Sequence, residues 1–306
     1  MVEPVQQFDV ISMGRIGIDL YPHRPGAPTA QDRPLGPVLR GSAAHVAVTA
    51  ARLGRSSAVI ARTGADRLGA YLHQTLTECG VDDRWVTPAA CPAPGAEPPG
   101  LEIHTDELDC FAIRAARLFW ITGTGLGAEP SRSATLAALK CRDRTGTTVL
   151  ELDRRPARWT GTAWGDPEEA RPYRAEALRH ATVAVGDLDE CETVTGARGP
   201  RACAEALLAA GVELAVVRQG PTGVLAVHRD GTTVEVPPVP QDMADGPGAG
   251  DAFGGSLCHG LLSGWEPERT VRYAHAGGAP QAARPARSPA LPAQAAAGGL
   301  LNGVSP

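Results

Sequence analysis

The chain is predicted to fold as an α/β protein whose mostly parallel sheet is covered by helices on both faces. Short apolar runs alternate along the sequence with helix-like segments, which is the pattern of a sheet between two helical layers. Most of these runs are continuously apolar, so the strands are expected to be buried. The 306 residues could hold one large α/β domain or two average ones, and no internal repeat divides them.

The elements of the first half follow in order. Residues 10–13 predict the first strand, and residues 43–53, which are rich in small side chains, predict a helix. Residues 58–61 predict a second strand. Residues 68–79 predict a second helix, which Gly80 closes because glycine accepts the left-handed conformation that often follows a helix.

The second half continues the alternation. Further buried strands are expected at residues 118–121, 147–152, 181–185 and 214–217, with amphipathic helices at residues 131–141 and 200–210. In such sheets ligands bind at the carboxyl ends of the strands. The polar and glycine-rich segments discussed below come directly after strands, as this rule requires.

Composition narrows the class of function. Hydrophobic residues make up 43% of the chain but aromatic residues only 4%, so we expect a core of Ala, Val and Leu. The 29 basic residues are outnumbered by 34 acidic ones, and the net charge of −5 argues against a general nucleic-acid or anionic-membrane surface. A polyanionic ligand must therefore be held locally.

The cysteines and the absence of long apolar stretches predict a cytoplasmic protein. The seven cysteines are odd in number, scattered and without a Cys-x-x-Cys pair, so we interpret them as reduced thiols and not as a disulfide framework or a zinc site. The N-terminus lacks a basic region followed by an apolar run, and no stretch approaches 18 apolar residues. We expect no membrane partner.

Residues 245–253, Asp-Gly-Pro-Gly-Ala-Gly-Asp-Ala-Phe, are the most informative segment. Small residues at positions 248–250 let backbone N–H groups converge, and a helix beginning there adds a partial positive charge. This arrangement is typical of a cradle for a phosphoryl group. Asp251, in the first helical turn, is then suited to take a proton from an attacking hydroxyl. A glycine-rich loop with Asp251 as a helix cap is the alternative.

Gly248-Ala249-Gly250-Asp251, with the flanking residues, resembles the second signature of the ribokinase (PfkB) family of carbohydrate kinases. Residues 8–22 resemble one branch, which phosphorylates 5-dehydro-2-deoxygluconate in myo-inositol catabolism. Further matches follow in family order at residues 149–156, 183–186 and 216–225. Ordered co-occurrence over roughly residues 8–280 is more specific than one glycine motif.

The resemblance implies a ribokinase-like three-layer sandwich over residues 1–280. It also implies that Asp251 is the catalytic base and that the backbone amides of Gly248, Ala249 and Gly250 form an anion hole for the transferred phosphate.

The family usually carries a β lid over the sugar, and here it is expected to be reduced, with remnants near residues 14–40 and 88–104. Residues 88–99 are rich in Pro and Ala and predict a loop. Because family lids often help to form dimers, a homodimer is possible but weakened by the loss of the lid.

The C-terminal segment, residues 281–306, is rich in Pro and Ala and predicted to be partly disordered. Prolines at positions 280, 285, 289 and 292 make it unlikely that a helix persists through residues 284–292, since an interior proline costs about 3 kcal/mol.

The expected sugar-binding residues lie in the first 45 positions. Asp19 follows the first strand, where the family uses a carboxylate to bind sugar hydroxyls; a loop Asp or a helix cap is the alternative. Arg15 can bind a substrate carboxylate through paired N–H groups, or it is an ordinary surface arginine. Gly41 keeps the close backbone approach of the family's Gly-Gly turn, and His45 replaces an Asn that binds hydroxyls. A hydrogen-bonded helix histidine is the alternative for His45.

Asp187 and Glu190 match the family's Asn-x-x-Glu, whose acid organises Mg²⁺ through water and whose Asn lies near the phosphates. The second carboxylate, at Asp187, can strengthen Mg²⁺ binding, but it also repels ATP. An acidic first turn of a helix is the alternative for both residues.

The remaining nucleotide residues also follow from the resemblance. Gly220 and Gly223 resemble turn residues beside ATP, and Arg218 stands where the most similar branch has Lys. His275 stands where an Asn commonly faces adenine.

The sequence thus predicts an ATP-dependent and Mg²⁺-dependent kinase for a hydroxyl of a sugar or sugar acid, most like 5-dehydro-2-deoxygluconate. The substitutions at 40, 45, 187 and 275 and the reduced lid leave open a kinase relic that only binds or regulates. A kinase for a different cyclitol or a nucleoside is another alternative. A dehydrogenase is disfavoured because no Gly-x-Gly-x-x-Gly follows the first strand, and a P-loop enzyme because the chain has no Gly-Lys pair.

Overall fold

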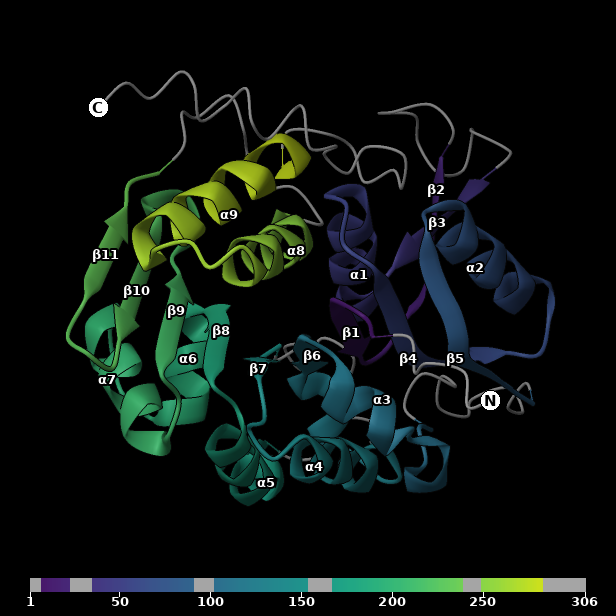
Figure 1. Ribbon diagram of the computed structural model, residues 1–306, viewed down its shortest axis with the longest axis horizontal. Helices are drawn as coiled ribbons and strands as arrows, with labels where there is room; N and C mark the ends of the chain where they lie inside the picture. The colour runs from purple at the N-terminus through teal and green to yellow at the C-terminus, as the bar shows by residue number, and fades with distance from the viewer. Residues whose placement is uncertain (1–6, 23–34, 91–101, 154–166, 239–248, 283–306) are drawn as a thin grey trace.

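The computed structural model describes residues 7–22, 35–90, 102–153, 167–238 and 249–282. In these ranges a nine-stranded sheet in the order β11-β10-β9-β8-β7-β6-β1-β4-β5 lies between two layers of helices (Figure 1). The predicted α/β class with a mostly parallel central sheet is confirmed. No helix in the described ranges is long and apolar enough to cross a membrane.

Seven strands of the large sheet are parallel, and two antiparallel pairings follow at one edge. The parallel strands are β1 (Val10–Met13), β4 (Ser57–Gly64), β5 (Val81–Ala89), β6 (Leu118–Thr122), β7 (Thr147–Glu151), β8 (Val183–Asp187) and β9 (Leu214–Arg218). The edge is completed by β10 (Val224–His228), antiparallel to β9, and by β11 (Thr233–Val236), antiparallel to β10. The carboxyl ends of the seven parallel strands therefore share one edge of the sheet.

A separate two-stranded sheet follows β1. Strand β2 (Gly17–Pro22) pairs antiparallel with β3 (Leu35–Arg40), with Gly17 opposite Arg40. This small sheet coincides with the lid remnant expected near residues 14–40. The second expected remnant, residues 88–104, falls largely on residues 91–101, which lie outside the described residues.

The helices divide between the two faces of the large sheet (Figure 1). One face carries α1 (Ser42–Arg52), α2 (Arg67–Glu78), α8 (Ala249–Leu262) and α9 (Pro267–Ala282); the other carries α3 (Cys110–Ala115), α4 (Ser131–Arg142), α5 (Pro167–His180), α6 (Leu188–Thr195) and α7 (Pro200–Ala210).

Alternate residues of β6 show how the sheet fills both layers. Leu118 and Trp120 join a buried cluster with Phe253 of α8, whereas Phe119 joins one with Leu139 of α4. Successive strand side chains point to opposite faces, so a continuously apolar run is what a doubly covered strand requires.

Helix α9 continues through Pro280 and ends at Ala282, before residues 284–292, through which the sequence predicts that no helix persists. Pro280 removes only one backbone hydrogen bond, near the end of the helix. Val271 and Ala274 of α9 are fully buried against α8 and the sheet, and this packing holds the helix. Residues 283–306 lie outside the described residues.

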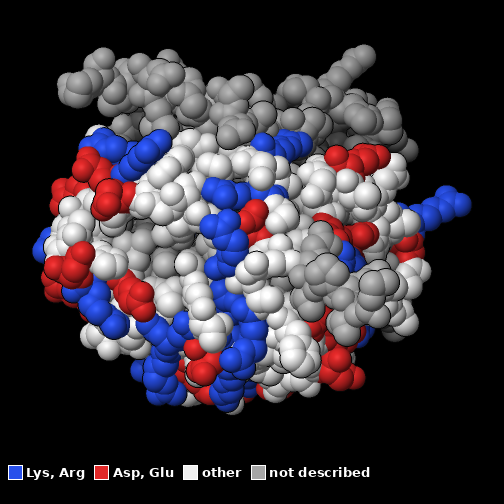
Figure 2. All heavy atoms as spheres, in the orientation of Figure 1, with Lys and Arg blue, Asp and Glu red and all other residues white. Residues whose placement is uncertain are grey.

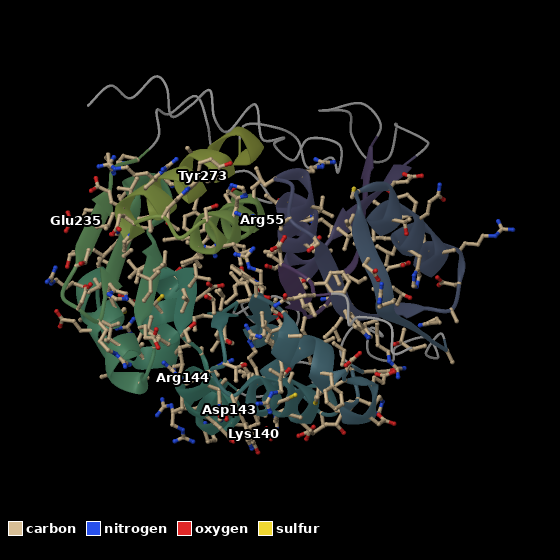
Figure 3. The ribbon with its side chains drawn as sticks, viewed as in Figure 1. Arg55, Lys140, Asp143, Arg144, Glu235 and Tyr273 are labelled. Atoms are coloured by element: carbon tan, nitrogen blue, oxygen red, sulfur yellow. The ribbon has the colours of Figure 1, made fainter. Side chains whose placement is uncertain are left out.

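The face shown in Figure 2 carries Lys and Arg side chains that run from top to bottom down its middle. Two basic residues labelled in Figure 3 are paired with acids: Lys140 Nζ lies 2.7 Å from Glu176 Oε1, and Arg144 pairs with Glu213. Arg144 also donates to the carbonyl of Ala181 at 2.5 Å. The Lys140 contact joins α4 to α5, and the Arg144 contacts join the loop after α4 to the segments before β8 and β9.

The C-terminal end of α8 is fixed by a cluster around His259. Arg55 Nε donates to His259 Nδ1 at 3.3 Å, and Arg55 Nη2 donates to the carbonyl of His259 at 3.3 Å. The imidazole stacks on Tyr273 with 5.7 Å between ring centroids and meets Trp265 edge-on at 5.4 Å. Arg55 and Tyr273, labelled in Figure 3, thus hold His259 from two sides. Burial, and then the charge of Arg55, lower the pKa of His259.

Acidification should therefore destabilise the protein through His259. A folded-state pKa below the unfolded value of about 6.5 means that the unfolded chain binds the proton more tightly, so the stabilisation is present above that pH and is lost as pH falls below it. We expect the drop in Tm between pH 7 and pH 5 to be smaller in His259→Phe than in the unmodified protein. Equal drops in the two proteins would contradict this assignment.

Candidate active site

The first turn of α8 is the centre of the candidate site. Ala249, Gly250 and Asp251 are its first three residues, and the backbone N–H groups of a first helical turn have no partner within the helix. The prediction that Asp251 lies in the first turn of a helix is confirmed for the backbone. Gly248 and the side chain of Asp251 lie outside what the structure describes, and the roles of these residues remain predictions.

Two glycines bring α8 against α1. A Cβ on Gly255 would lie 2.4 Å from the Cβ of Thr49 and 2.9 Å from the carbonyl oxygen of Val46. A Cβ on Gly254 would lie 2.8 Å from both the Trp120 ring and the Val46 side chain. Only glycine fits these distances, so the Gly-Gly pair after the signature sets the spacing between the two helices.

The start of α1 meets the chain that follows β1. Gly41, the N-cap of α1, has φ of 107°, and a Cβ there would lie 2.3 Å from the carbonyl oxygen of Arg15 and 2.9 Å from the Cα of Ile16. Gly41 therefore makes the close backbone approach that the sequence predicted. It also places two predicted substrate residues, Gly41 and Arg15, side by side.

The two other predicted substrate residues differ in what the structure shows. Asp19 lies in β2 opposite Val38 of β3, and its side chain is outside the description. His45 is 5% exposed, and its Nε2–H donates to the carbonyl of Leu39 at 2.8 Å. This contact favours the alternative of a hydrogen-bonded helix histidine for His45.

The ends of β8 and β9 bring three predicted residues together. Arg218 stands opposite Asp187 in the sheet register, and its Nε lies 2.9 Å from Asp187 Oδ1. Its Nη2 lies 3.9 Å from Glu190 Oε2. The backbone N–H of Asp187 donates to Glu190 Oε2 at 2.7 Å, so Glu190 also caps α6. The carboxylate of Asp187, which stands where the family has Asn, is therefore paired with the guanidinium of Arg218.

Glu190 is a strongly perturbed titratable group of the site. Burial raises the pKa of Glu190 to about 7, with Arg218 opposing and Asp187 reinforcing the shift. Groups with strongly perturbed pKa values are concentrated at functional sites.

The predicted glycine turn and His275 meet around the end of β11. Gly220 and Gly223 have φ of 54° and 108°, and a Cβ on Gly223 would lie 2.1 Å from the carbonyl oxygen of Val236 and 3.1 Å from the carbonyl carbon of Pro237. The His275 imidazole hydrogen-bonds the backbone of Pro237, while burial lowers the pKa of His275. Its Nε2 is buried and has no hydrogen-bond partner among the described residues. Gly223 and His275 thus both approach the segment that follows β11.

Sequence reasoning assigned no role to Glu151, the last residue of β7. Its side chain is 4% exposed, and its Oε2 accepts hydrogen bonds from Ser42 Oγ and, at 3.3 Å, from Trp120 Nε1. Asp153, two residues on, accepts a hydrogen bond from Thr124 Oγ1. A carboxylate that ends a continuously apolar strand is the signal that could have identified Glu151.

Comparison with known proteins agrees with this geometry. Residues 102–293 match the pfkB family of carbohydrate kinases. The chain is 28% identical to 5-dehydro-2-deoxygluconokinase of Shouchella clausii over 309 residues, which cover 94% of this chain and 93% of that protein. It is 26% identical to the Clostridium tetani protein of the same name over 314 residues, covering 93% and 90%.

Among solved structures, a putative ribokinase II from E. coli in complex with ATP and Mg²⁺ superposes with a TM-score of 0.85 at 20% identity, covering 97% of this chain and all of that one. This likeness establishes the ribokinase-like fold. Since the family match extends over more than half of the chain, the protein belongs to the pfkB family of carbohydrate kinases.

Proposed function

We propose that this carbohydrate kinase transfers the γ-phosphoryl group of ATP to a hydroxyl of a sugar or sugar acid, with 5-dehydro-2-deoxygluconate as the nearest candidate. The observation that carries the proposal is the first turn of α8, which places the backbone of Ala249, Gly250 and Asp251 at the start of a helix packed tightly on α1. The names of the relatives support the substrate class.

In this proposal Asp251 accepts the proton of the attacking hydroxyl. A carboxylate beside a phosphoryl group is unfavourable unless it takes part in the chemistry, and proton removal makes the hydroxyl a better nucleophile. The amides of Gly248, Ala249 and Gly250 would stabilise the charge on the transferred group, because helix N-termini favour anions.

Arg218, Gly220, Gly223 and His275 would bind the nucleotide. Of these four residues, Arg218 has the permanent positive charge. Its guanidinium already contacts Asp187 and Glu190. The convergence of Gly223 and His275 on Pro237 supports a binding place for the base. ATP bound there would direct its phosphates toward the end of β8.

Asp187 and Glu190 fit Mg²⁺ that is shared with the phosphates. No cluster of three or more metal-binding side chains occurs among the described residues, so a cage made of protein ligands alone is not supported there. Mg²⁺ is usually held by one or two carboxylates together with water and substrate phosphates, which is what these two residues can supply. When bound, the ion would neutralise charge on the phosphates.

The acceptor would bind between β2 and the start of α1. Gly41 and Arg15 touch through their backbones, and Asp19 lies on the adjoining strand β2. A guanidinium at Arg15 suits an acid sugar, because it can bind a carboxylate through two parallel hydrogen bonds.

A substrate panel tests the proposal. ADP release from Mg-ATP should depend on one acceptor among sugar acids, ketohexoses, cyclitols and nucleosides, and a sugar acid should give the highest kcat/KM. Silence across the panel, with ATP binding still seen by calorimetry, would contradict phosphoryl transfer and favour a binding or regulatory protein. Activity only with nucleosides would contradict the substrate class.

A further inference from the structure

A buried carboxylate at the end of β7 links the two helices that begin at the candidate site. We propose that Glu151 is a positioning residue that holds the acceptor-binding start of α1 and the catalytic start of α8 in one fixed arrangement. The inference rests on the proposed function, because it assigns the acceptor to α1 and proton removal to α8.

Glu151 is placed to act on both helices at once. It lies on the face of the sheet that α1 and α8 cover, since Val149, two residues earlier in β7, joins the same buried cluster as Val46 of α1 and Phe253 of α8. It is 4% exposed and sits between β6 and β8 in register with Thr122 and Val185. A buried carboxylate that is not hydrogen-bonded would be strongly unfavourable.

The first contact reaches α1. Ser42, the first residue of that helix, donates its hydroxyl to Glu151 Oε2, and Ser42 is 8% exposed. It directly follows Gly41, where a Cβ would lie 2.3 Å from the carbonyl oxygen of Arg15 and 2.9 Å from the Cα of Ile16. Fixing Ser42 therefore fixes the turn that brings the candidate acceptor residues together.

The second contact reaches α8 through an aromatic ring. Trp120 Nε1 donates to the same Oε2 of Glu151 at 3.3 Å, which sets the orientation of the indole. The far edge of that ring lies against Gly254, where a Cβ would be 2.8 Å away. Gly254 is one helical turn after Asp251, so a tilt of Trp120 would displace the turn that carries the base.

A charged group suits this position. Negative charge near the N-terminus of α1 is stabilised by the partial positive charge of the helix end, and two donors share one carboxylate oxygen. The field of Glu151 also reaches α8: burial raises the pKa of the Cys258 thiol, and the charge of Glu151 adds to that shift. An amide at position 151 would keep an acceptor oxygen but lose the charge.

The two contacts predict effects on different kinetic parameters in two single variants. Ser42→Ala should raise KM for the acceptor about fivefold or more while kcat stays within about twofold, because only the α1 contact is lost. Trp120→Phe should lower kcat about fivefold or more with KM for the acceptor within about twofold, because the ring loses its N–H and its fixed orientation. Glu151→Leu should show both effects, and Glu151→Gln smaller ones.

Thr148→Val is the matched control. Thr148 is a fully buried polar residue of the same strand, and its hydroxyl donates to the carbonyl of Gly146 at 3.3 Å, at the amino end of β7. This variant should lower Tm without changing kcat or KM per folded molecule. If the variants at 42, 120 and 151 behave in the same way as Thr148→Val, Glu151 has only a structural role and the proposal is overturned.

A second measurement separates this inference from the proposed function. In Glu151→Leu, amide hydrogen exchange should increase in the first turn of α1 and in residues 252–258 of α8, and not in α4 or α7. That result supports the link even if the unmodified protein transfers phosphate to no acceptor tested. Unchanged exchange in both helices would overturn the link even in an active kinase.

Discussion

Replacing Asp251 with Asn should lower kcat by about 10²–10⁴-fold while the protein remains folded and binds ATP. Asn has nearly the same shape, but its amide cannot accept the proton of an attacking hydroxyl. Removing one negative charge beside the phosphates should leave ATP binding unchanged or make it tighter. The expected loss is therefore in turnover and not in nucleotide affinity.

Asp189→Asn is the control for this experiment. Asp189 is an exposed acid in the first turn of α6, so it tests the effect of losing one carboxylate near a helix start. Steady-state ADP release at saturating acceptor measures kcat, and calorimetry measures ATP binding. Turnover retained in Asp251→Asn, or reduced equally in Asp189→Asn, would remove Asp251 from the mechanism.

The doubly covered parts of the fold are the parts that the sequence predicts best. Residues 214–217 are continuously apolar because β9 packs helices on both faces, and the structure gives β9 as Leu214–Arg218 with its first four residues buried. Helix α7 spans Pro200–Ala210 as predicted, since a first-turn proline and Gly211 mark its ends. Here the local pattern and the tertiary packing agree.

The elements that were not predicted lie at edges or depend on distant neighbours. Strand β11 alternates exposed and buried residues over only four positions, and β5 contains charged residues and Pro88 because it is an edge strand. Helix α5 contains Pro172, and an interior proline in the sequence argues against predicting a helix there. Short or polar segments of this kind become strands or helices only because the rest of the sheet is already in place.

In the candidate site, too, some features could be predicted from the sequence and others could not. The positions of Asp187 and Gly41 could be predicted from the rule that site residues follow strands, together with the family resemblance. The contacts that define Glu151 could not, because Ser42 lies 109 residues away in the sequence and Trp120 lies 31 residues away. The contact of His45 with Leu39 is local, but it depends on how the chain turns from β3 into α1, which the residue pattern does not specify.

Arg142, the last residue of α4, is the polar side chain whose loss should destabilise the fold most. It is fully buried, and its guanidinium lies beside the end of α3, where carbonyls that have no partner within the helix favour a cation. Its Nη1 and Nη2 donate to the carbonyls of Ile113, Arg114, Ala116, Arg117 and Thr147 at distances of 2.6 to 3.4 Å. One side chain therefore donates hydrogen bonds to backbone carbonyls at the end of α3, in the loop before β6 and at the start of β7.

Arg142→Met should lower the free energy of unfolding by about 3–5 kcal/mol. The methionine fills much of the space but donates to none of the carbonyls. Each buried carbonyl left without a partner costs about 1–3 kcal/mol, and this cost is partly offset because a buried charge is also removed.

Arg144→Met is the matched control. Arg144 also donates to backbone carbonyls, including those of Ala181 and Gly211, but its side chain is 29% exposed. Water can replace its contacts, so a loss of only about 1 kcal/mol is expected there. Urea unfolding at constant pH measures both changes, and equal losses in the two variants would show that burial does not make Arg142 special.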